Sequence, residues 1–208
     1  MRKLPTALLA AALLAGLPLL AQAESQYTTG TASPITATAR LDFQITVPKI
    51  LFLRVGAGAD YTNTATINQI SFAVPAANVG NGAAVAATAA SGDLGNGAVT
   101  AKLVGNNGTI TLSSSTVGAL GNGSGDSISY SQIQTTTATN TTATALNAPA
   151  LADGAVTSTT VAPGAGSKVV NLDAKWTYAY LNGAVVAPGT YGGVNANNSR
   201  VTYTASMP

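Results

Sequence analysis

Apolar and polar side chains alternate without a break along residues 35–47, the stretch ITATARLDFQITV. Successive side chains of a β-strand point to opposite faces, so this period of two predicts an extended strand with one apolar face. Pro34 and Pro48 bracket the stretch, and proline cannot donate a backbone hydrogen bond to a sheet. The apolar face consists of Ile35, Ala37, Ala39, Leu41, Phe43, Ile45 and Val47.

Shorter stretches with a similar pattern follow. KILFLRVG (residues 49–56) is apolar on both faces and predicts a strand buried on both sides. TINQISFAVP (66–75) alternates at period two and predicts a further strand that ends at Pro75. AVTAKLVGNNGTITL (98–112) alternates into and out of the turn GNNG, which predicts a β-hairpin.

The richest apolar pattern lies near the C-terminus. One face of a predicted strand carries Val170, Leu172, Ala174, Trp176, Tyr178 and Tyr180. The sequences LNG and PGTYGG then predict turns. A last alternating strand carries Val201, Tyr203, Ala205 and Met207 on one face. Together with Tyr191, the aromatic residues form either a sugar-stacking platform or part of the core, and their alternation with aliphatic residues favours the core.

No stretch after residue 23 shows a convincing helical period of useful length. The tract at 76–97, rich in glycine, alanine and asparagine, predicts a long loop. Short strands separated by glycine, proline and asparagine turns predict an all-β fold, an antiparallel β-sandwich.

The first 23 residues have the organisation of a cleaved signal peptide. Arg2 and Lys3 precede an apolar stretch at 7–20, and Ala21-Gln22-Ala23 supplies the small-x-small cleavage site. The apolar stretch is shorter than the roughly 20 residues of a membrane-spanning helix. We therefore expect export, no membrane span after cleavage, an N-terminal extension or first strand at 24–48, and one domain at 49–208.

Charge and composition exclude several functions. Of nine basic residues, Arg2 and Lys3 leave with the signal peptide, so seven remain against seven acids. The seven basic residues are scattered singly along the sequence, so we expect no nucleic-acid binding. With no histidine, a Ser-His-Asp triad is impossible and the commonest metal ligand is missing. We expect no enzyme activity, cofactor or metal site; the glycine-rich 121–129, a single copy resembling a calcium-binding repeat, is better interpreted as a surface loop.

The chain also has no cysteine, so disulfides cannot stabilise it after export. Its cohesion must come from buried apolar surface, from a metal or from a partner chain.

Residues 35–47, the short apolar stretch after them, and the ending PGTYGG…VTYTASMP resemble the subunits of chaperone–usher pili. The closest resemblance is to the archaic, spore-coat-U-like group of Gram-negative bacteria. It implies an immunoglobulin-like, pilin-type body that lacks its final strand, which another subunit's N-terminal segment supplies by β-augmentation. It also implies that the apolar face of residues 35–47 is the donor strand.

By the same resemblance, Val201, Tyr203, Ala205 and Met207 border the groove or contact a chaperone. The partners implied are other pilin subunits, a periplasmic pilus chaperone and an outer-membrane usher. The protein is then exported through the periplasm and becomes part of a fimbria at the cell surface.

Two alternatives stay open from the sequence. Residues 35–47 are equally explained as the first strand of a self-complete sandwich. The chain is then a self-contained secreted binding module, or an adhesin that recognises carbohydrate through tyrosine and tryptophan.

Overall fold

The computed structural model describes residues 24–208, so the predicted signal peptide lies outside the described residues. The chain divides into two units, Met1–Val47 and Pro48–Pro208. We call residues 24–47 the N-terminal segment and Pro48–Pro208 the body. Between residues 24 and 208, none of the helical turns has the length and apolar character needed to cross a bilayer.

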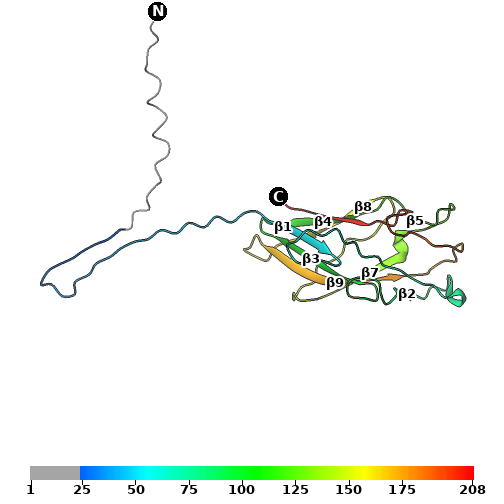
Figure 1. Ribbon diagram of the computed structural model, residues 1–208, viewed down its shortest axis with the longest axis horizontal. Helices are drawn as coiled ribbons and strands as arrows, with labels where there is room; N and C mark the ends of the chain where they lie inside the picture. The colour runs from blue at the N-terminus through cyan, green and yellow to red at the C-terminus, as the bar shows by residue number, and fades with distance from the viewer. Residues whose placement is uncertain (1–23) are drawn as a thin grey trace, which may run out of the picture. The chain divides into compact units, whose positions relative to one another are not determined.

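The body is built from antiparallel strands, which confirms the predicted all-β class (Figure 1). In the larger sheet β1 pairs with β3, and β3 pairs with β9. The short β2 pairs with the end of β9 on the same edge as β3, and β7 pairs with the other edge of β9. The strands of this sheet are β1 (Leu51–Val55), β2 (Val85–Ala86), β3 (Ala98–Gly105), β7 (Ile133–Ala138) and β9 (Val170–Tyr180).

The second sheet has three strands in the order β10-β4-β8. These are β4 (Ile110–Ser115), β8 (Val156–Val161) and β10 (Thr202–Ser206). A small pair, β5 (Leu120–Gly121) with β6 (Ser127–Ile128), and two 3-10 turns, η1 (Ala76–Asn78) and η2 (Tyr130–Gln132), complete the elements. The stretch 121–129 thus forms a small surface hairpin, in which Asn122 Nδ2 donates to the Asp126 carboxylate at 2.8 Å.

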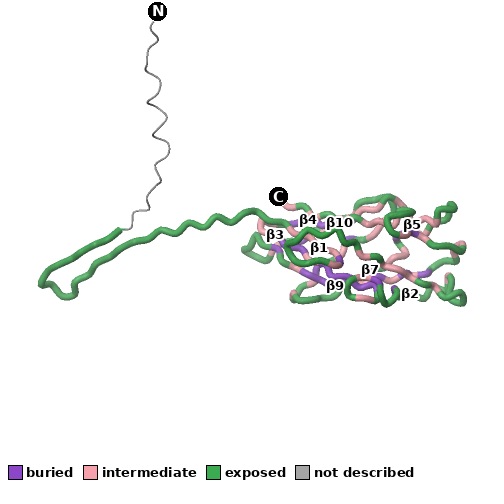
Figure 2. The backbone as a smooth tube through the Cα atoms, viewed as in Figure 1, coloured by how far each residue is buried: buried purple, intermediate pink, exposed green. Residues whose placement is uncertain are grey.

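The two larger sheets share one hydrophobic core. Inward-facing residues of β3 and β9 meet those of β4 and β8, and Figure 2 shows the buried positions gathered along β3, β4 and β9. Leu146, from the loop between β7 and β8, is fully buried among them. The indole Nε1 of the fully buried Trp176 donates to the Leu146 carbonyl at 2.7 Å, which anchors this loop in the core.

The predicted hairpin at 98–112 is wrong, although both of its strands are present. β3 pairs with β1 and β9, whereas β4 pairs with β8 and β10, so the chain crosses from one sheet to the other. Leu103 and Ile110 are both fully buried in the shared core. Alternation identifies the residues that are buried, and two strands facing each other across a core satisfy it as well as two neighbouring strands do.

The two preceding strand predictions are only partly correct. β1 forms, but Leu51 is 40% exposed and no described strand pairs with the second edge of β1, so the strand is not buried on both sides. Residues 66–75 form no strand, and their single bridge to the rest of the described chain joins Phe72 to Ala87. Both stretches are apolar because they border a groove, as described below.

A buried carboxylate organises the threonine-rich stretch after β7. Asp173 of β9 accepts hydrogen bonds from the backbone amides of Thr141 and Thr142, at 3.0 and 2.8 Å, and from both of their hydroxyl groups. Burial by itself raises the pKa of a carboxyl group, but these hydrogen bonds outweigh it and hold the pKa of Asp173 well below its usual range. Residues 140–146 are thereby held against the sheet.

Candidate functional site

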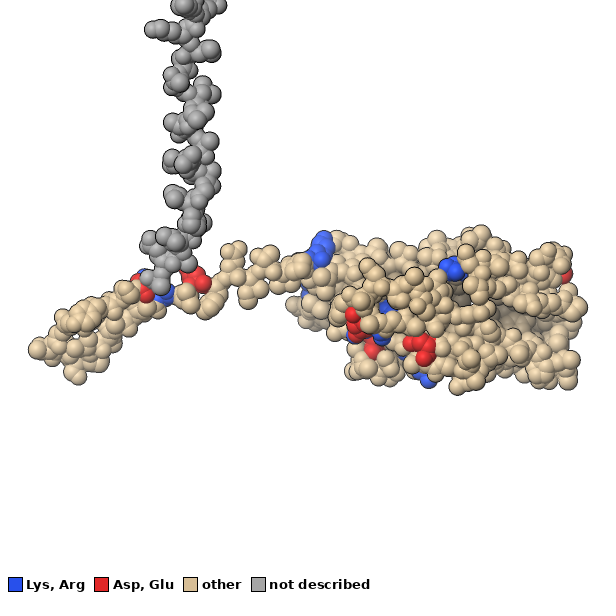
Figure 3. Space-filling view, viewed as in Figure 1, with Lys and Arg blue, Asp and Glu red and all other residues tan. Residues whose placement is uncertain are grey.

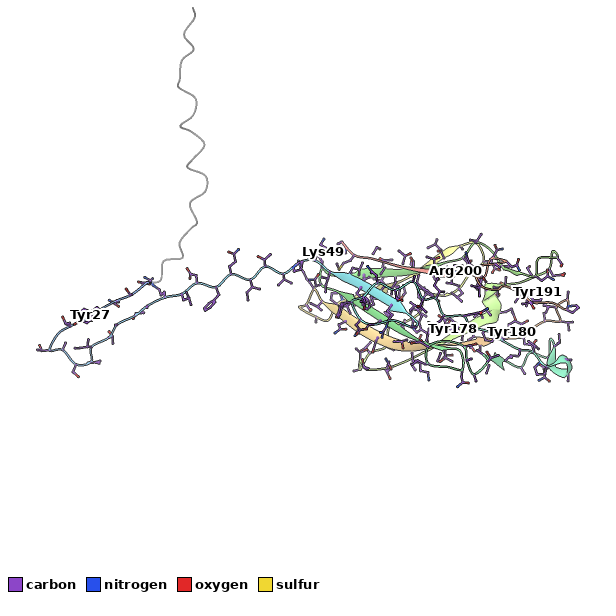
Figure 4. All side chains as sticks on the ribbon, in the orientation of Figure 1. Tyr27, Lys49, Tyr178, Tyr180, Tyr191 and Arg200 are labelled. Atoms are coloured by element: carbon purple, nitrogen blue, oxygen red, sulfur yellow. The ribbon has the colours of Figure 1, made fainter. Side chains whose placement is uncertain are left out.

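A groove with a volume of about 1010 Å³ opens in the body. Its walls come from β1 and residues 66–72, from the start of β10, and from the loop at 186–195. In Figure 4, Arg200 lies on the β10 side of the opening and Tyr178 and Tyr180 on the β9 side. In Figure 3 the surface of this region is recessed and almost entirely uncharged.

Tyrosine side chains form much of the groove's interior. The hydroxyl groups of Tyr178 and Tyr203 lie 2.9 Å apart, and the Tyr203 ring packs against Trp176 with centroids 5.3 Å apart. Burial raises the pKa of Tyr178, and burial together with the neighbouring Tyr178 raises the pKa of Tyr203. Both hydroxyl groups therefore stay protonated and connect the larger sheet to β10.

Hydrogen bonds from tyrosine hydroxyl groups hold the loop that precedes β10 in the chain. The Tyr130 hydroxyl donates to the Asn198 carbonyl at 2.8 Å, and the Tyr191 hydroxyl donates to the Ala187 carbonyl at 2.9 Å. Burial, followed by the proximity of Tyr203 and Asp153, raises the pKa of Tyr130 to about 12. These hydrogen bonds therefore fix the loop that forms the wall at this end of the groove.

Both long borders of the groove carry unpaired backbone groups. On the β10 side, the carbonyls of Thr202 and Thr204 face β4, because they accept the hydroxyl groups of Ser115 and Ser113. Since successive residues of a strand point their N–H and C=O groups to opposite edges, those of Tyr203 and Ala205 face away from β4. No described strand pairs with that edge of β10.

On the opposite border, the backbone amides of residues 67–70 donate to no acceptor within residues 24–208. The bonded groups of this stretch face residues 88–92. The carbonyls of Gln69 and Ser71 accept from the amides of Gly92 and Thr88 at 3.3 and 2.8 Å, and the Ser71 amide donates to Ser91 Oγ at 2.9 Å. An apolar floor between two unpaired backbone edges is the environment that an added β-strand fills.

The N-terminal segment places its predicted donor face in solvent. The structure assigns no strand to it, and Ala37 and Ala39 are exposed. The exposed fractions of the larger side chains are 48% for Ile35, 69% for Leu41, 85% for Phe43, 86% for Ile45 and 72% for Val47. A contiguous row of exposed apolar side chains this long is typical of a surface that another molecule covers.

The predicted C-terminal residues border the core and the groove. Val201, Tyr203, Ala205 and Met207 are half-buried, and alternate with exposed neighbours. Val201 and Tyr203 line the groove, whereas Ala205 and Met207 pack against the core. Trp176, Tyr178 and Tyr180 are buried, which confirms the core interpretation for these three aromatic residues.

Two parts of the site had no signal in the sequence. The wall at 66–72 looks like an ordinary strand in its pattern, and only its missing partners identify it as a border. Of the described residues that line the groove, Arg200 alone is charged. A single arginine before a strand has no pattern that distinguishes it from a solvated surface residue.

Similarity to known proteins adds no constraint on this site. No protein-family model, curated protein or solved structure matches the chain.

Proposed function

We propose that the body is an immunoglobulin-like β-sandwich with one strand missing. In such domains strands A, B, E and D form one sheet, and C, F and G form the other. Here β1, β3, β9 and β7 are adjacent in the order expected of A, B, E and D, and β4 and β10 correspond to C and F. The place of G, beside β10, is an open edge within the described residues.

We infer that the chain is a secreted structural subunit of a bacterial surface fimbria, assembled by donor-strand exchange. The observation that carries this proposal is the presence, in one chain, of an open-edged groove and an exposed segment with a period-two apolar face. Burying each large side chain of that face stabilises the junction by about 1.5–3 kcal/mol before ordering costs. Five such side chains are enough for a durable non-covalent polymer.

The proposed function implies partners before and after assembly. Before assembly, the open groove needs a temporary strand, which fits the periplasmic pilus chaperone and outer-membrane usher that the sequence resemblance implies. After assembly, the partners are neighbouring subunits, and the location is the fimbria at the cell surface. The sparse surface charge supports close packing of subunits, because few charges need desolvation at the contact.

The test compares two charge insertions into the N-terminal segment of the mature chain, residues 24–208. The first variant carries Phe43→Asp and Ile45→Asp on the apolar face; its matched control carries Gln44→Asp and Thr46→Asp on the polar face. Each protein is refolded from denaturant, and its oligomers are measured by gel filtration and by resistance to detergent without heating. We expect polymers from the wild type and the control, and none from the first variant. A wild-type chain that refolds to a stable monomer would contradict the proposal.

The alternative function is a self-contained secreted binding module or adhesin for carbohydrate. It draws support from Tyr191, a half-buried aromatic residue in the groove wall. The burial of Trp176, Tyr178 and Tyr180 leaves few aromatic faces open to a sugar, so we favour the structural subunit. A stable monomer that binds a glycan array, with binding lost in Tyr191→Ala, would favour the alternative.

A further inference from the structure

We propose that the groove accepts the N-terminal segment of a second copy of this chain, antiparallel to β10, with Asp42 of one copy beside Arg200 of the other. This inference rests on the proposed function, and it specifies the occupant of the groove and its register.

Charge complementarity supports a second copy as the occupant. Arg200 is the only charged residue among the described residues lining the groove, and it forms no ion pair within residues 24–208. In the N-terminal segment, Arg40 Nε is paired with the Glu24 carboxylate at 2.7 Å. Asp42 has no ion-pair partner among the described residues. The groove and the segment thus each carry one unpaired charge, of opposite sign.

The two ends of the body determine the direction of the strand. The body begins at Pro48, close to the C-terminal end of β10, because Lys49 Nζ donates to the Pro208 carbonyl at 2.7 Å. The groove lies at the other end, along the start of β10 and the loop at 186–195. If the donating body lies beyond that loop, the N-terminus of its segment reaches toward Pro208. The segment then runs, from its N- to its C-terminus, from Pro208 to the loop, which is antiparallel to β10. The same contact repeated between identical copies is head-to-tail, which generates an open filament.

The register places the two alanines of the segment where the body is closed and three of its large side chains where the body is open. Opposite residues in this antiparallel register are Leu41 with Val201, Ala39 with Tyr203, Ala37 with Ala205, and Ile35 with Met207. The two alanines face the part of β10 whose Ala205 already packs on the core and is outside the groove lining. Phe43, Ile45 and Val47 extend past Arg200 to the part of the groove that the loop at 186–195 lines.

The backbone groups agree with the same register. The odd residues of β10 offer their N–H and C=O groups to the open edge, so the odd residues of the incoming segment must exchange hydrogen bonds with them. Within the segment, the amide of Thr38, an even residue, already donates to Gln26 Oε1 at 2.8 Å. The opposite edge, with the backbone of Ala37 and Ala39, is the one left for β10.

Disulfide mapping tests the register, since the chain has no cysteine of its own. In the proposed register Thr38 lies opposite Thr204 at a pair without backbone hydrogen bonds, where Cα atoms are about 4.5 Å apart and a disulfide fits. The test protein is residues 24–208 with Thr38→Cys and Thr204→Cys. The matched control carries Thr46→Cys and Thr204→Cys, which would be opposite in a parallel strand with the same Asp42–Arg200 pair.

After refolding, oxidation and heating in detergent without reductant, we expect a covalent ladder from the Thr38/Thr204 protein alone. A ladder from the Thr46/Thr204 control, or non-covalent polymers that neither pair cross-links, would overturn the register and leave the proposed function intact. A monomer with an internal disulfide would show that the chain's own segment fills the groove, and would overturn the second copy as occupant. No polymer of any kind would sink the proposed function and this inference with it.

Charge reversal tests the Asp42–Arg200 pair separately. In Asp42→Arg two like charges meet, and we expect polymer formation to slow by about tenfold or more. Adding Arg200→Asp to the same chain restores the opposite charges, and the rate should return to near that of the wild type. If Asp42→Arg polymerises as fast as the wild type, or the double variant is no faster than the single one, the pair is overturned.

Discussion

The hydroxyl groups of Tyr178 and Tyr203 lie 2.9 Å apart and join the larger sheet to the edge strand β10 inside the groove. Among the described strands, β4 alone pairs with β10, so backbone hydrogen bonds to a strand hold one edge of β10. Side-chain contacts across the core, including the packing of Tyr203 on Trp176, must therefore hold β10 against the larger sheet.

This pair predicts a non-additive mutational cycle. Tyr203→Phe removes one hydroxyl group and leaves that of the buried Tyr178 without its partner, which we expect to cost about 1–3 kcal/mol of unfolding free energy. The Tyr178→Phe/Tyr203→Phe protein leaves no unpaired hydroxyl group, and it should be no less stable than either single variant. Urea unfolding of the wild type, the two single variants and the double variant measures the cycle. If the loss in the double variant equals the sum of the losses in the two single variants, the two hydroxyl groups act independently.

The raised pKa values of Tyr130, Tyr178 and Tyr203 predict a loss of stability at alkaline pH. A folded-state pKa above the unfolded value of about 10 contributes stability that is fully present below pH 10. For Tyr130 this contribution is lost as the pH rises through its folded-state pKa of about 12. Unfolding free energies measured between pH 9 and 12 should fall, and fall less steeply in Tyr130→Phe. A profile that is flat over this range would contradict the raised pKa values.

Asp173 predicts a loss of stability at acidic pH. Its pKa is lowered in the folded state, so its contribution is present above the unfolded value of about 3.9 and is lost as the pH falls toward the folded-state pKa. Asp173→Asn loses charge-assisted hydrogen bonds, and we expect it to cost about 1.5–3 kcal/mol at pH 7. Unfolding measured between pH 7 and 2 should show a shallower acid limb in this variant.

Asp126→Asn serves as the control for that experiment, because Asp126 is exposed on the small β5–β6 hairpin. It should keep both the wild-type stability and the wild-type acid limb. An equal effect of the two substitutions would mean that general surface charge, and not the contacts of Asp173, sets the acid limb.

Gly92 predicts a steric cost in the turn that supports the groove wall. Its φ is 80°, and a Cβ added there would lie 2.1 Å from the Ala98 carbonyl oxygen. Gly82 has a similar φ of 74° with nothing within 4 Å, so it is the matched control. Both alanine variants carry about 1–2 kcal/mol of backbone strain. Gly92→Ala should be clearly less stable than Gly82→Ala in thermal unfolding, and equal melting temperatures would contradict the geometry.

The sequence pattern predicted burial better than it predicted pairing. The alternation at 170–180 correctly indicated β9 and its inward face, because a long strand repeats its signal over many residues. The hairpin at 98–112 failed because side-chain periodicity contains no information about which strand supplies the backbone partners. The prediction of a strand at 66–75 failed for a related reason: the pattern suits a strand, but within the described residues its only bridge is at Phe72.

Side-chain periodicity could not predict the roles of single polar residues. Asp173 falls on the polar face of β9, where alternation predicts solvent, but Thr141 and Thr142 cover it from a loop. Arg200 is equally inconspicuous, because its significance comes from the uncharged surroundings that folding brings to it. Contacts between residues distant in sequence determine both positions.

The nearness of Pro48 and Pro208 has an engineering consequence. Asn106 Nδ2 donates to the Pro48 carbonyl at 2.8 Å, and Asn107 Nδ2 donates to the Pro208 carbonyl at 2.6 Å, so one asparagine pair holds both ends of the body. A copy of residues 35–47 fused after Pro208 through a tight turn would fold back along β10 in the antiparallel sense. Such a permuted chain, freed of its original extension, would close its own sheet and exist as a single molecule, a capped unit that can neither accept a strand from a neighbour nor lend one.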